Sequence, residues 1–271
     1  MLVTLNGELE LNREPILTSY PIVFSAAFLV SACATPPPAN DWQSIFDGES
    51  LDGWTPKIVG EALGEDRNQL FRADDGVLRV SYEAAPEFEG NFGHLFYRLP
   101  AANYRLRFEY QFNGDQAAGG PGWALMNSGV MVHAQAPETM AVDQAFPVSI
   151  EAQLLGLPET MTARTTANIC TPGTHFELGG QVITQHCVNS TTPAAPADAW
   201  VAFEIEVRGD EYMELSINGA PAYRLERPHY DANDTEVQRL SLSGPLSEGY
   251  FALQAESHPV AFRNIEWMRL D

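Results

Sequence analysis

Strict alternation of apolar and polar residues is the feature that most constrains how this chain can fold. In the segment 104–112 every second residue is large and apolar: Tyr104, Leu106, Phe108, Tyr110 and Phe112. The segment 201–207 alternates in the same way. Successive side chains of a β-strand point to opposite faces, so this pattern is typical of strands with one buried and one wet face. Both segments are therefore predicted to be half-buried antiparallel strands.

Turn signals and further short apolar runs extend this pattern along the chain. Asn218-Gly219 stands between the runs 212–217 and 222–225, which predicts a hairpin with a type I′ turn. Further strands are predicted at 77–82, 93–98, 129–133, 148–154, 249–255 and 260–270. No long segment has a helical period. The fold class predicted is an all-β sandwich or jelly roll of antiparallel strands with little helix.

The beginning of the chain resembles an export signal. An apolar run, Tyr20–Ala32, ends in small residues before Cys33, and Val30–Cys33 resembles a lipobox, in which the cysteine is acylated after cleavage. The run is too short to span a bilayer. We expect residues 1–32 to be a lipoprotein signal peptide, 33–41 a Pro-rich tether and 42–271 a single sandwich domain. The expected location is the bacterial cell envelope, periplasmic or on the outer membrane, with the lipid anchor as the sole membrane contact. The alternative is a buried helix with an ordinary cysteine.

The two remaining cysteines are predicted to form a disulfide. Cys170 and Cys187 lie 17 positions apart, and exported chains meet an oxidising environment. Two free thiols are the first alternative. A zinc site with His175 and His186 is the second, although this spacing matches no standard zinc module.

The charge of the chain limits its partners. With 15 basic and 36 acidic residues, the formal net charge is -21. Nucleic acid is excluded as a partner, because binding a polyphosphate requires clustered Lys and Arg. Adhesion of the protein surface to anionic lipid is disfavoured for the same reason. A neutral or cationic ligand remains compatible with this charge.

One predicted strand carries polar residues that could meet a ligand. If Val130 and Val132 face the core, Gly129 and His133 share the opposite face with Met131. A glycine there would let a ligand approach the backbone closely. The alternative is a solvated histidine on an outward face.

Two further strands place acidic and amide groups on one face. Glu151 and Gln153 share a face, where a carboxylate and a carboxamide can bind neighbouring sugar hydroxyls and the carboxylate can act as a base. Gln254, Glu256 and His258 are two positions apart and would lie on one face if the strand continued, so Glu256 could hold His258 in one tautomer. The alternatives are a charged face in water and a structural histidine at a turn.

Trp123 is the aromatic residue best placed to stack on a sugar. It ends the segment Gly119–Trp123, which is too rich in glycine to bury it easily. Trp54, Tyr97, Tyr250 and Trp267 could also stack, although core positions are the alternative for most of them.

An ordered set of short motifs resembles the 3-keto-disaccharide hydrolase family, once catalogued as a domain of unknown function. The opening segment Ile45–Trp54, which reads IFDGESLDGW, is similar to the start of that family. Five further segments match in order: Asp75–Leu78, Asn127–Val130, Ile150–Leu155, Asn218-Gly219 and Leu253–Ile265. The resemblance therefore runs over the predicted domain. It implies a concanavalin-like jelly roll with a concave sugar-binding face.

The resemblance also implies activity on glycosides that are oxidised at C3. A C3 ketone acidifies the C2 proton, so one base and a stabiliser of the enolate suffice for β-elimination of the C1 oxygen, followed by hydration. Glu151 or His258 is the expected base, with Glu256 orienting His258. Arg263 or a divalent metal would stabilise the enolate. The residues expected to bind the substrate are Gln153, Ser128, His133, Arg263 and Trp123.

The predicted function is hydrolysis of 3-keto-glycosides or 3-keto-disaccharides in the cell envelope. The expected partner is an oligosaccharide or glycoside, and no cofactor is expected apart from that metal. Because sandwiches of this kind host binding modules as well as enzymes, a non-catalytic carbohydrate-binding surface lipoprotein is the alternative. A structural surface protein is a third hypothesis, under which the polar strand faces merely meet water.

Overall fold

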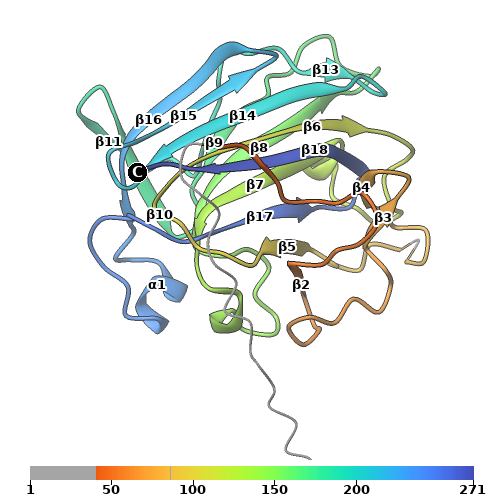
Figure 1. Ribbon diagram of the computed structural model, residues 1–271, viewed down its shortest axis with the longest axis horizontal. Coiled ribbons are helices and arrows are strands. Elements are labelled where there is room, and N and C mark those ends of the chain that lie inside the picture. The colour runs from red at the N-terminus through yellow and green to blue at the C-terminus, as the bar shows by residue number, and fades with distance from the viewer. Residues whose placement is uncertain (1–40, 86) are drawn as a thin grey trace, which may run out of the picture. The chain divides into compact units, whose positions relative to one another are not determined.

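The strands form two sheets that pack face to face (Figure 1) in the computed structural model, which describes residues 41–85 and 87–271. The ten-stranded sheet runs in the order β11 (Gln181–Ile183), β10 (Thr174–Leu178), β16 (Ala220–Tyr230), β15 (Tyr212–Ile217), β14 (Val201–Arg208), β6 (Asn103–Phe112), β18 (Val260–Arg269), β4 (Val77–Val80) and β3 (Phe71–Asp74), with β1 (Gln43–Ser44) beside β18.

The eight-stranded sheet runs in the order β12 (Cys187–Val188), β9 (Asn168–Cys170), β8 (Ile150–Leu157), β7 (Asn127–Ala134), β17 (Tyr250–Ala255), β5 (Gly93–Tyr97) and β2 (Trp54–Ile58). The short β13 (Ala195–Pro196) pairs with β8 in parallel, whereas the other paired strands are antiparallel. Together the described residues form one compact unit with the predicted jelly-roll architecture.

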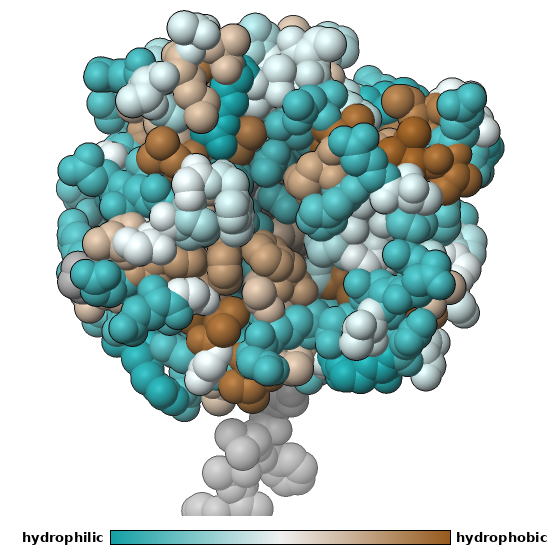
Figure 2. All heavy atoms as spheres, turned by 180° about the vertical axis from the view of Figure 1, so that it is seen from behind, coloured by the Kyte–Doolittle hydropathy of each residue, from teal (hydrophilic) through white to brown (hydrophobic). Residues whose placement is uncertain are grey.

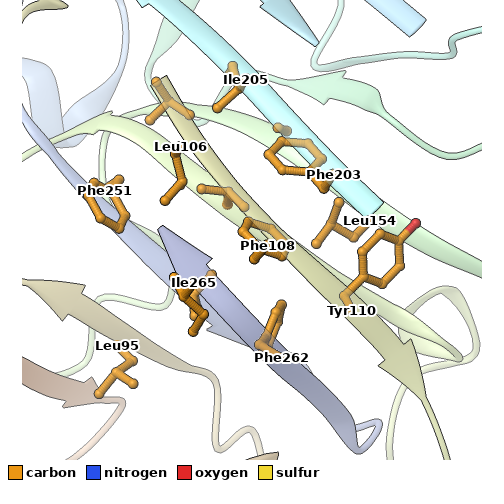
Figure 3. Close-up of a cluster of buried hydrophobic side chains, with 14 of the residues drawn as sticks. Leu95, Leu106, Phe108, Tyr110, Leu154, Phe203, Ile205, Phe251, Phe262 and Ile265 are labelled. Carbon is orange, nitrogen blue, oxygen red and sulfur yellow. The ribbon is translucent and has the colours of Figure 1, made fainter. Parts of the chain in front are cut away.

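The apolar faces of the two sheets meet in a shared core. The alternating residues of β6 are all buried, and Phe108 stacks on Phe203 of β14 with ring centroids 4.8 Å apart. Figure 3 shows these rings beside Leu154 of β8, which comes from the opposite sheet. Burial of each such side chain contributes about 1.5–3 kcal/mol. The period-two pattern thus fixes which face of each strand is buried.

Each strand predicted from the sequence is present, with boundaries shifted by at most five residues. The hairpin between β15 and β16 turns at Asn218 and Gly219, which both have positive φ (51° and 76°), as a type I′ turn requires. Strands β1 to β3 were not predicted. The short strands β9–β13, which lie between residues 168 and 196 and form the region that the disulfide crosses, were not predicted either.

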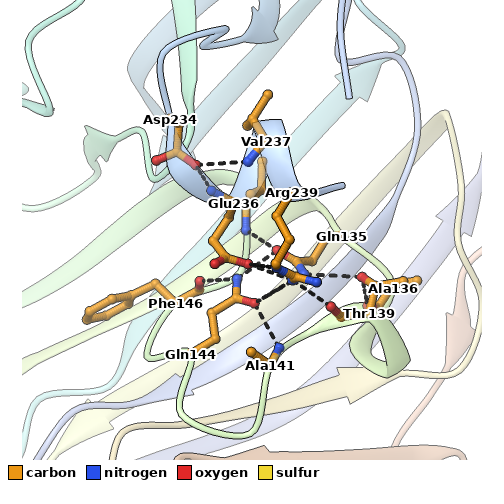
Figure 4. A network of polar contacts seen from close by, with 11 residues as sticks. Gln135, Ala136, Thr139, Ala141, Gln144, Phe146, Asp234, Glu236, Val237 and Arg239 are labelled. Atoms are coloured by element: carbon orange, nitrogen blue, oxygen red, sulfur yellow. Dashed lines mark hydrogen bonds and ion pairs between the residues drawn. The ribbon is translucent and has the colours of Figure 1, made fainter. Parts of the chain in front are cut away.

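A polar network holds one long loop against the short helix α1 (Thr235–Arg239), as Figure 4 shows. Arg239 donates to the carbonyl oxygen of Thr139 at 2.8 Å, beside the 3-10 helix η2 (Pro137–Thr139). Gln144 donates to the side chain of Gln135 and to the carbonyl oxygen of Phe146, both at 2.8 Å. The network therefore fixes the position of Phe146.

The surface agrees with the acidic composition. Figure 2 shows one face on which hydrophilic residues predominate and apolar side chains form separate patches. No helix of the described residues is long and apolar enough to cross a membrane. The predicted signal peptide, the tether up to residue 40 and the lipidation site Cys33 lie outside the described residues.

Candidate active site

A hollow of about 390 Å³ opens on the outer face of the eight-stranded sheet. Glu151 and Gln153 of β8 point into it because the residues between and beside them, such as Ala152 and Leu154, belong to the core. Glu256, directly after β17, lines the same hollow. We call it the glutamate hollow. The structure thus brings together side chains that are about a hundred positions apart in the sequence.

Glu151 and Glu256 form a buried pair of interacting carboxyl groups. Their exposed fractions are 6% and 3%. Burial raises the pKa of Glu151. Burial also raises the pKa of Glu256 well above its usual range; the neighbouring Glu151 raises it further, and the guanidinium of Arg164 lowers it. Two adjacent buried carboxylates resist being charged together, so the pair retains a proton at pH values where an isolated glutamate is ionised.

Several buried polar atoms of the eight-stranded sheet have no hydrogen-bond partner within the described residues. Three belong to residues that line the hollow: Asn127 Oδ1, Glu151 Oε1 and Glu256 Oε2. The others are both amide atoms of Gln254 on β17 and His94 Nε2 on β5, which do not line it. Burial, and then the charge of Lys57, lower the pKa of His94 to about 3, so its ring is neutral at neutral pH. Buried polar groups normally have partners. The three unpartnered atoms at the hollow are therefore free to bind a polar ligand.

Gln153 is held in one orientation by a residue that the sequence did not reveal. Asn168 of β9 donates its Nδ2 to Gln153 Oε1 at 3.0 Å, and its own Oδ1 accepts from Thr165 and from the backbone of Ser190. The Nε2 group of Gln153 is therefore the part of the amide that is available to a ligand. Nothing in the local sequence around Asn168 marks it, because its partner is 15 residues away.

Trp123 forms one wall of the glutamate hollow and remains 56% exposed, as its glycine-rich loop predicted. It belongs to the 3-10 helix η1 (Gly122–Ala124) and stacks on Phe92, with ring centroids 6.0 Å apart and planes 6° from parallel. Gln116 of the same loop donates to Pro121 O and to Ser257 Oγ. The loop is thus tied to the residue that follows Glu256. By contrast, Trp54, Tyr97 and Trp267 are core residues, and Tyr250 is only partly buried.

The disulfide supports another part of the wall of the hollow. Cys170 of β9 and Cys187 of β12 are paired, as predicted, with Cα atoms 4.1 Å apart. Both cysteines line the hollow, together with Pro172 and His186. The zinc and free-thiol alternatives are therefore wrong.

His133 does not face the hollow, which corrects the prediction from strand parity. Its φ is +48°, and the register between β7 and β17 shifts at this point, so a β-bulge reverses the side chain. Its Nε2 lies 3.2 Å from Gly209 O, and its ring packs edge-on against the core residue Tyr104. Burial lowers the pKa of His133 to about 4. His133 is a structural histidine here.

Ser128 and Arg263 are also placed away from the hollow. Ser128 has the parity of Val130 and points inward, where its hydroxyl donates to Gln254 O at 2.8 Å. Arg263 lies on β18, in the other sheet, because the chain crosses between the sheets after β17. There it pairs with Glu109 and stacks on Trp200. The predictions that these two residues bind substrate, and that Arg263 stabilises an enolate, are wrong.

His258 does not form the expected pair with Glu256. Ser257 has a φ of +83°, which breaks the strand parity, and the ring of His258 packs edge-on against Phe112 at 5.7 Å. In the part of the chain that the structure describes, neither His258 Nδ1 nor Glu256 Oε2 has a hydrogen-bond partner. Burial lowers the pKa of His258 to about 4. The prediction that Glu256 orients His258 is therefore wrong, and His258 is not among the residues that line the hollow.

A metal centre was one of the expectations for this site. Across residues 41–85 and 87–271, no group of three or more His, Cys, Asp or Glu side chains is arranged to hold a metal ion.

Comparison with known proteins supports the sugar-related expectation at the level of the family. No curated protein matches the sequence. The fold is similar to a candidate glycosyl hydrolase from Parabacteroides distasonis, with 16% identity and a TM-score of 0.50 over 85% of this chain and all of that one. A second such structure from the same organism has 17% identity and a TM-score of 0.49 over 85% of this chain and 94% of that one.

A third similar structure, the carbohydrate-binding module CBM66 from Bacillus subtilis, has 11% identity and a TM-score of 0.39 over 79% of this chain and 93% of that one. At these identities the likeness concerns the fold. The model of the 3-keto-alpha-glucoside-1,2-lyase-like domain, in contrast, matches residues 41–268, which is nearly the whole described part of the chain. The chain therefore belongs to the 3-keto-alpha-glucoside-1,2-lyase-like domain family.

Proposed function

We propose that this domain cleaves 3-keto-α-glycosides by β-elimination across C1 and C2, followed by hydration. Family membership supports a carbohydrate-related function. The observation that carries the finer proposal is the pair of buried, interacting carboxyl groups, Glu151 and Glu256, which open into one hollow beside an exposed tryptophan. Such a pair offers an acid and a base at the same pH.

In the elimination step, Glu151 in its ionised form removes the C2 proton, which the C3 ketone has made acidic. The electrons of the C2–H bond form the C1–C2 double bond, and the bond from C1 to the leaving oxygen breaks. Glu256 in its protonated form donates its proton to that oxygen. A base whose pKa is raised toward neutrality suits this step, because proton transfer is most effective near the working pH. The products are a 1,2-unsaturated 3-keto sugar and a free alcohol or sugar.

The hydration step reverses the proton movements. Glu256, now ionised, takes a proton from water as the water oxygen adds to C1. Glu151, now protonated, exchanges its acid proton with solvent while the intermediate is bound and then delivers a proton to C2. The product is a 3-keto sugar, and both carboxyl groups have regained their starting states. No net proton is gained or lost by the protein.

Amide groups, rather than Arg263, stabilise the enolate in this mechanism. Negative charge develops on the C3 oxygen as the C2 proton leaves, and a preoriented donor stabilises that charge. Gln153, held by Asn168, supplies an N–H group to the hollow. Trp123 offers an exposed ring that can stack on the C–H face of the sugar.

Turnover of a defined substrate tests this proposal. Wild-type protein incubated with methyl 3-keto-α-glucoside is expected to release 3-keto-glucose, whereas Glu151→Gln and Glu256→Gln lower kcat by about 10²–10⁴-fold. Glu159→Gln, a change of an exposed glutamate, is the matched control. Sugar binding without turnover by the wild-type protein would favour the alternative of a non-catalytic carbohydrate-binding module.

We also propose that the protein is exported and anchored through a lipid on Cys33. The lipobox-like sequence Val30–Cys33 supports this proposal, and the disulfide fits an oxidising compartment. Labelling of cells with a radioactive or clickable fatty acid should mark the wild-type protein and not Cys33→Ser. Equal labelling of both proteins would contradict the anchor.

A further inference from the structure

We infer that a second hollow beside the glutamate hollow binds the leaving sugar unit of a disaccharide, an inference that rests on the proposed function. The second hollow has a volume of about 350 Å³. It shares three lining residues with the glutamate hollow, namely Phe146, Pro172 and His186. The two hollows are therefore neighbours on either side of one ridge. Each lies at the lower end of the roughly 300–1,000 Å³ typical of ligand pockets.

The ridge between the hollows is rigidly built. Thr171 donates from its backbone N–H and from its hydroxyl to His186 O, at 2.8 and 3.2 Å. Cys187, which follows His186, is joined to Cys170 by the disulfide. On the other side, Gln144 holds the carbonyl of Phe146. A ligand that spans both hollows would thus meet a preformed surface, which lowers the entropic cost of binding.

The chemistry of the second hollow suits an uncharged sugar. His175 Nδ1 is buried without a partner in the described part of the chain, and its Nε2 lies 3.5 Å from Asp231 Oδ2. Thr184 supplies an exposed hydroxyl, and Glu236 a carboxylate that is shared with Arg239. These groups can donate to and accept from sugar hydroxyls.

The same lining disfavours anionic sugars. Three carboxylates, Asp231, Asp234 and Glu236, line the second hollow, and of its described lining residues none is Lys or Arg. A uronic acid or a sulfated sugar there would meet like charge. The occupant is therefore a neutral hexose unit, linked through the oxygen that leaves C1 of the keto sugar.

A comparison of two substrates isolates the second hollow. Methyl 3-keto-α-glucoside reaches only the glutamate hollow, whereas 3-keto-trehalose also places a glucose unit in the second one. Thr184→Trp should fill the second hollow and lower the ratio of kcat/KM for the disaccharide to that for the methyl glycoside by at least about tenfold. Val182→Trp is the matched control, because Val182 is exposed on the same hairpin and lines neither hollow.

A third substrate tests the charge of the site. A 3-keto-disaccharide with glucuronic acid as its leaving unit should be turned over at least about tenfold less efficiently than its glucose counterpart. If Thr184→Trp retained turnover with an unchanged ratio of kcat/KM for the disaccharide to that for the methyl glycoside, the second hollow would not bind the leaving sugar. The proposed function would be unaffected by that result. Absence of turnover on every substrate would overturn the proposed function, and this inference with it.

Discussion

The carboxylate of Glu151 lies over Gly129, in the space that a side chain on the neighbouring strand would take. A β-carbon added to Gly129 would stand 2.6 Å from Glu151 Oε1 and 2.8 Å from its Cγ. The sequence predicts that this glycine makes room for a ligand, whereas in the structure it makes room for the candidate base. The absence of a side chain on β7 thus determines where the carboxylate on β8 can lie.

This relationship predicts that Gly129→Ala inactivates the enzyme without unfolding it. The added methyl group must displace the carboxylate, and a displacement of about 1 Å can reduce activity by about 10²-fold. Steady-state kinetics with methyl 3-keto-α-glucoside measure the loss, and circular dichroism checks the fold. Gly122→Ala is the control, since a β-carbon there meets nothing within 4 Å. Wild-type kcat/KM in Gly129→Ala would show that the carboxylate position is unimportant.

Glu256→Gln should make the protein more stable at high pH. Because the pKa of Glu256 is raised in the folded state, the unfolded chain loses this proton first as the pH rises above about 4.5. The wild-type free energy of unfolding therefore falls with rising pH. In Glu256→Gln the side chain at this position does not titrate, so its share of that decrease disappears. We expect a gain of about 1–3 kcal/mol at pH 8 and little gain at pH 4. Urea unfolding at the two pH values measures it, and an equal change at both would contradict the raised pKa.

Trp123→Ala should weaken substrate binding more than it slows chemistry. The ring is exposed and contacts Phe92, so its loss leaves the core intact. Loss of one stacking contact corresponds to an increase in KM of about tenfold. Trp123→Phe should recover most of the affinity. If kcat fell and KM did not change, the ring would have another role.

His133→Gln should change acid stability and leave turnover within about twofold of the wild type. The buried ring has a pKa of about 4, whereas an unfolded histidine has a pKa near 6.5, so the unfolded state binds a proton first as the pH falls. The contribution of the neutral His133 ring to the free energy of unfolding is therefore lost as the pH falls from about 6.5 to about 4. Without this ring, the slope of unfolding free energy against pH near pH 5 should fall by about 1.4 kcal/mol per pH unit. An unchanged slope would show that His133 does not titrate as described.

Strand parity could predict part of the site because it depends only on local sequence. The alternation in β8 places Glu151 and Gln153 on the outer face, and the same rule applied to β17 brings Glu256 to that face. The hairpin at Asn218-Gly219 could be predicted equally well, because a type I′ turn requires positive φ at both central residues and Asn and Gly adopt it readily. These features need no knowledge of distant contacts.

The rule of alternating faces predicted the wrong side-chain orientation where the backbone departs from regular β-pairing. A bulge reversed His133, and the positive φ of Ser257 separated Glu256 from His258. Arg263 was misplaced for a different reason: the sequence does not show that β17 and β18 belong to different sheets. Asn168 acts through a partner on another strand, so only the assembled fold reveals it.

The proposed function depends on removal of the C2 proton of a 3-keto sugar by Glu151, and isotope exchange measures that step. The reaction is run in D₂O with methyl 3-keto-α-glucoside, and the early product is analysed by NMR against a control without enzyme. If Glu151 removes this proton, the released 3-keto-glucose carries deuterium at C2, Glu151→Gln gives no such product, and unoxidised methyl α-glucoside is not cleaved. Release of 3-keto-glucose without deuterium at C2, or equal cleavage of the unoxidised glycoside, would contradict this role of Glu151.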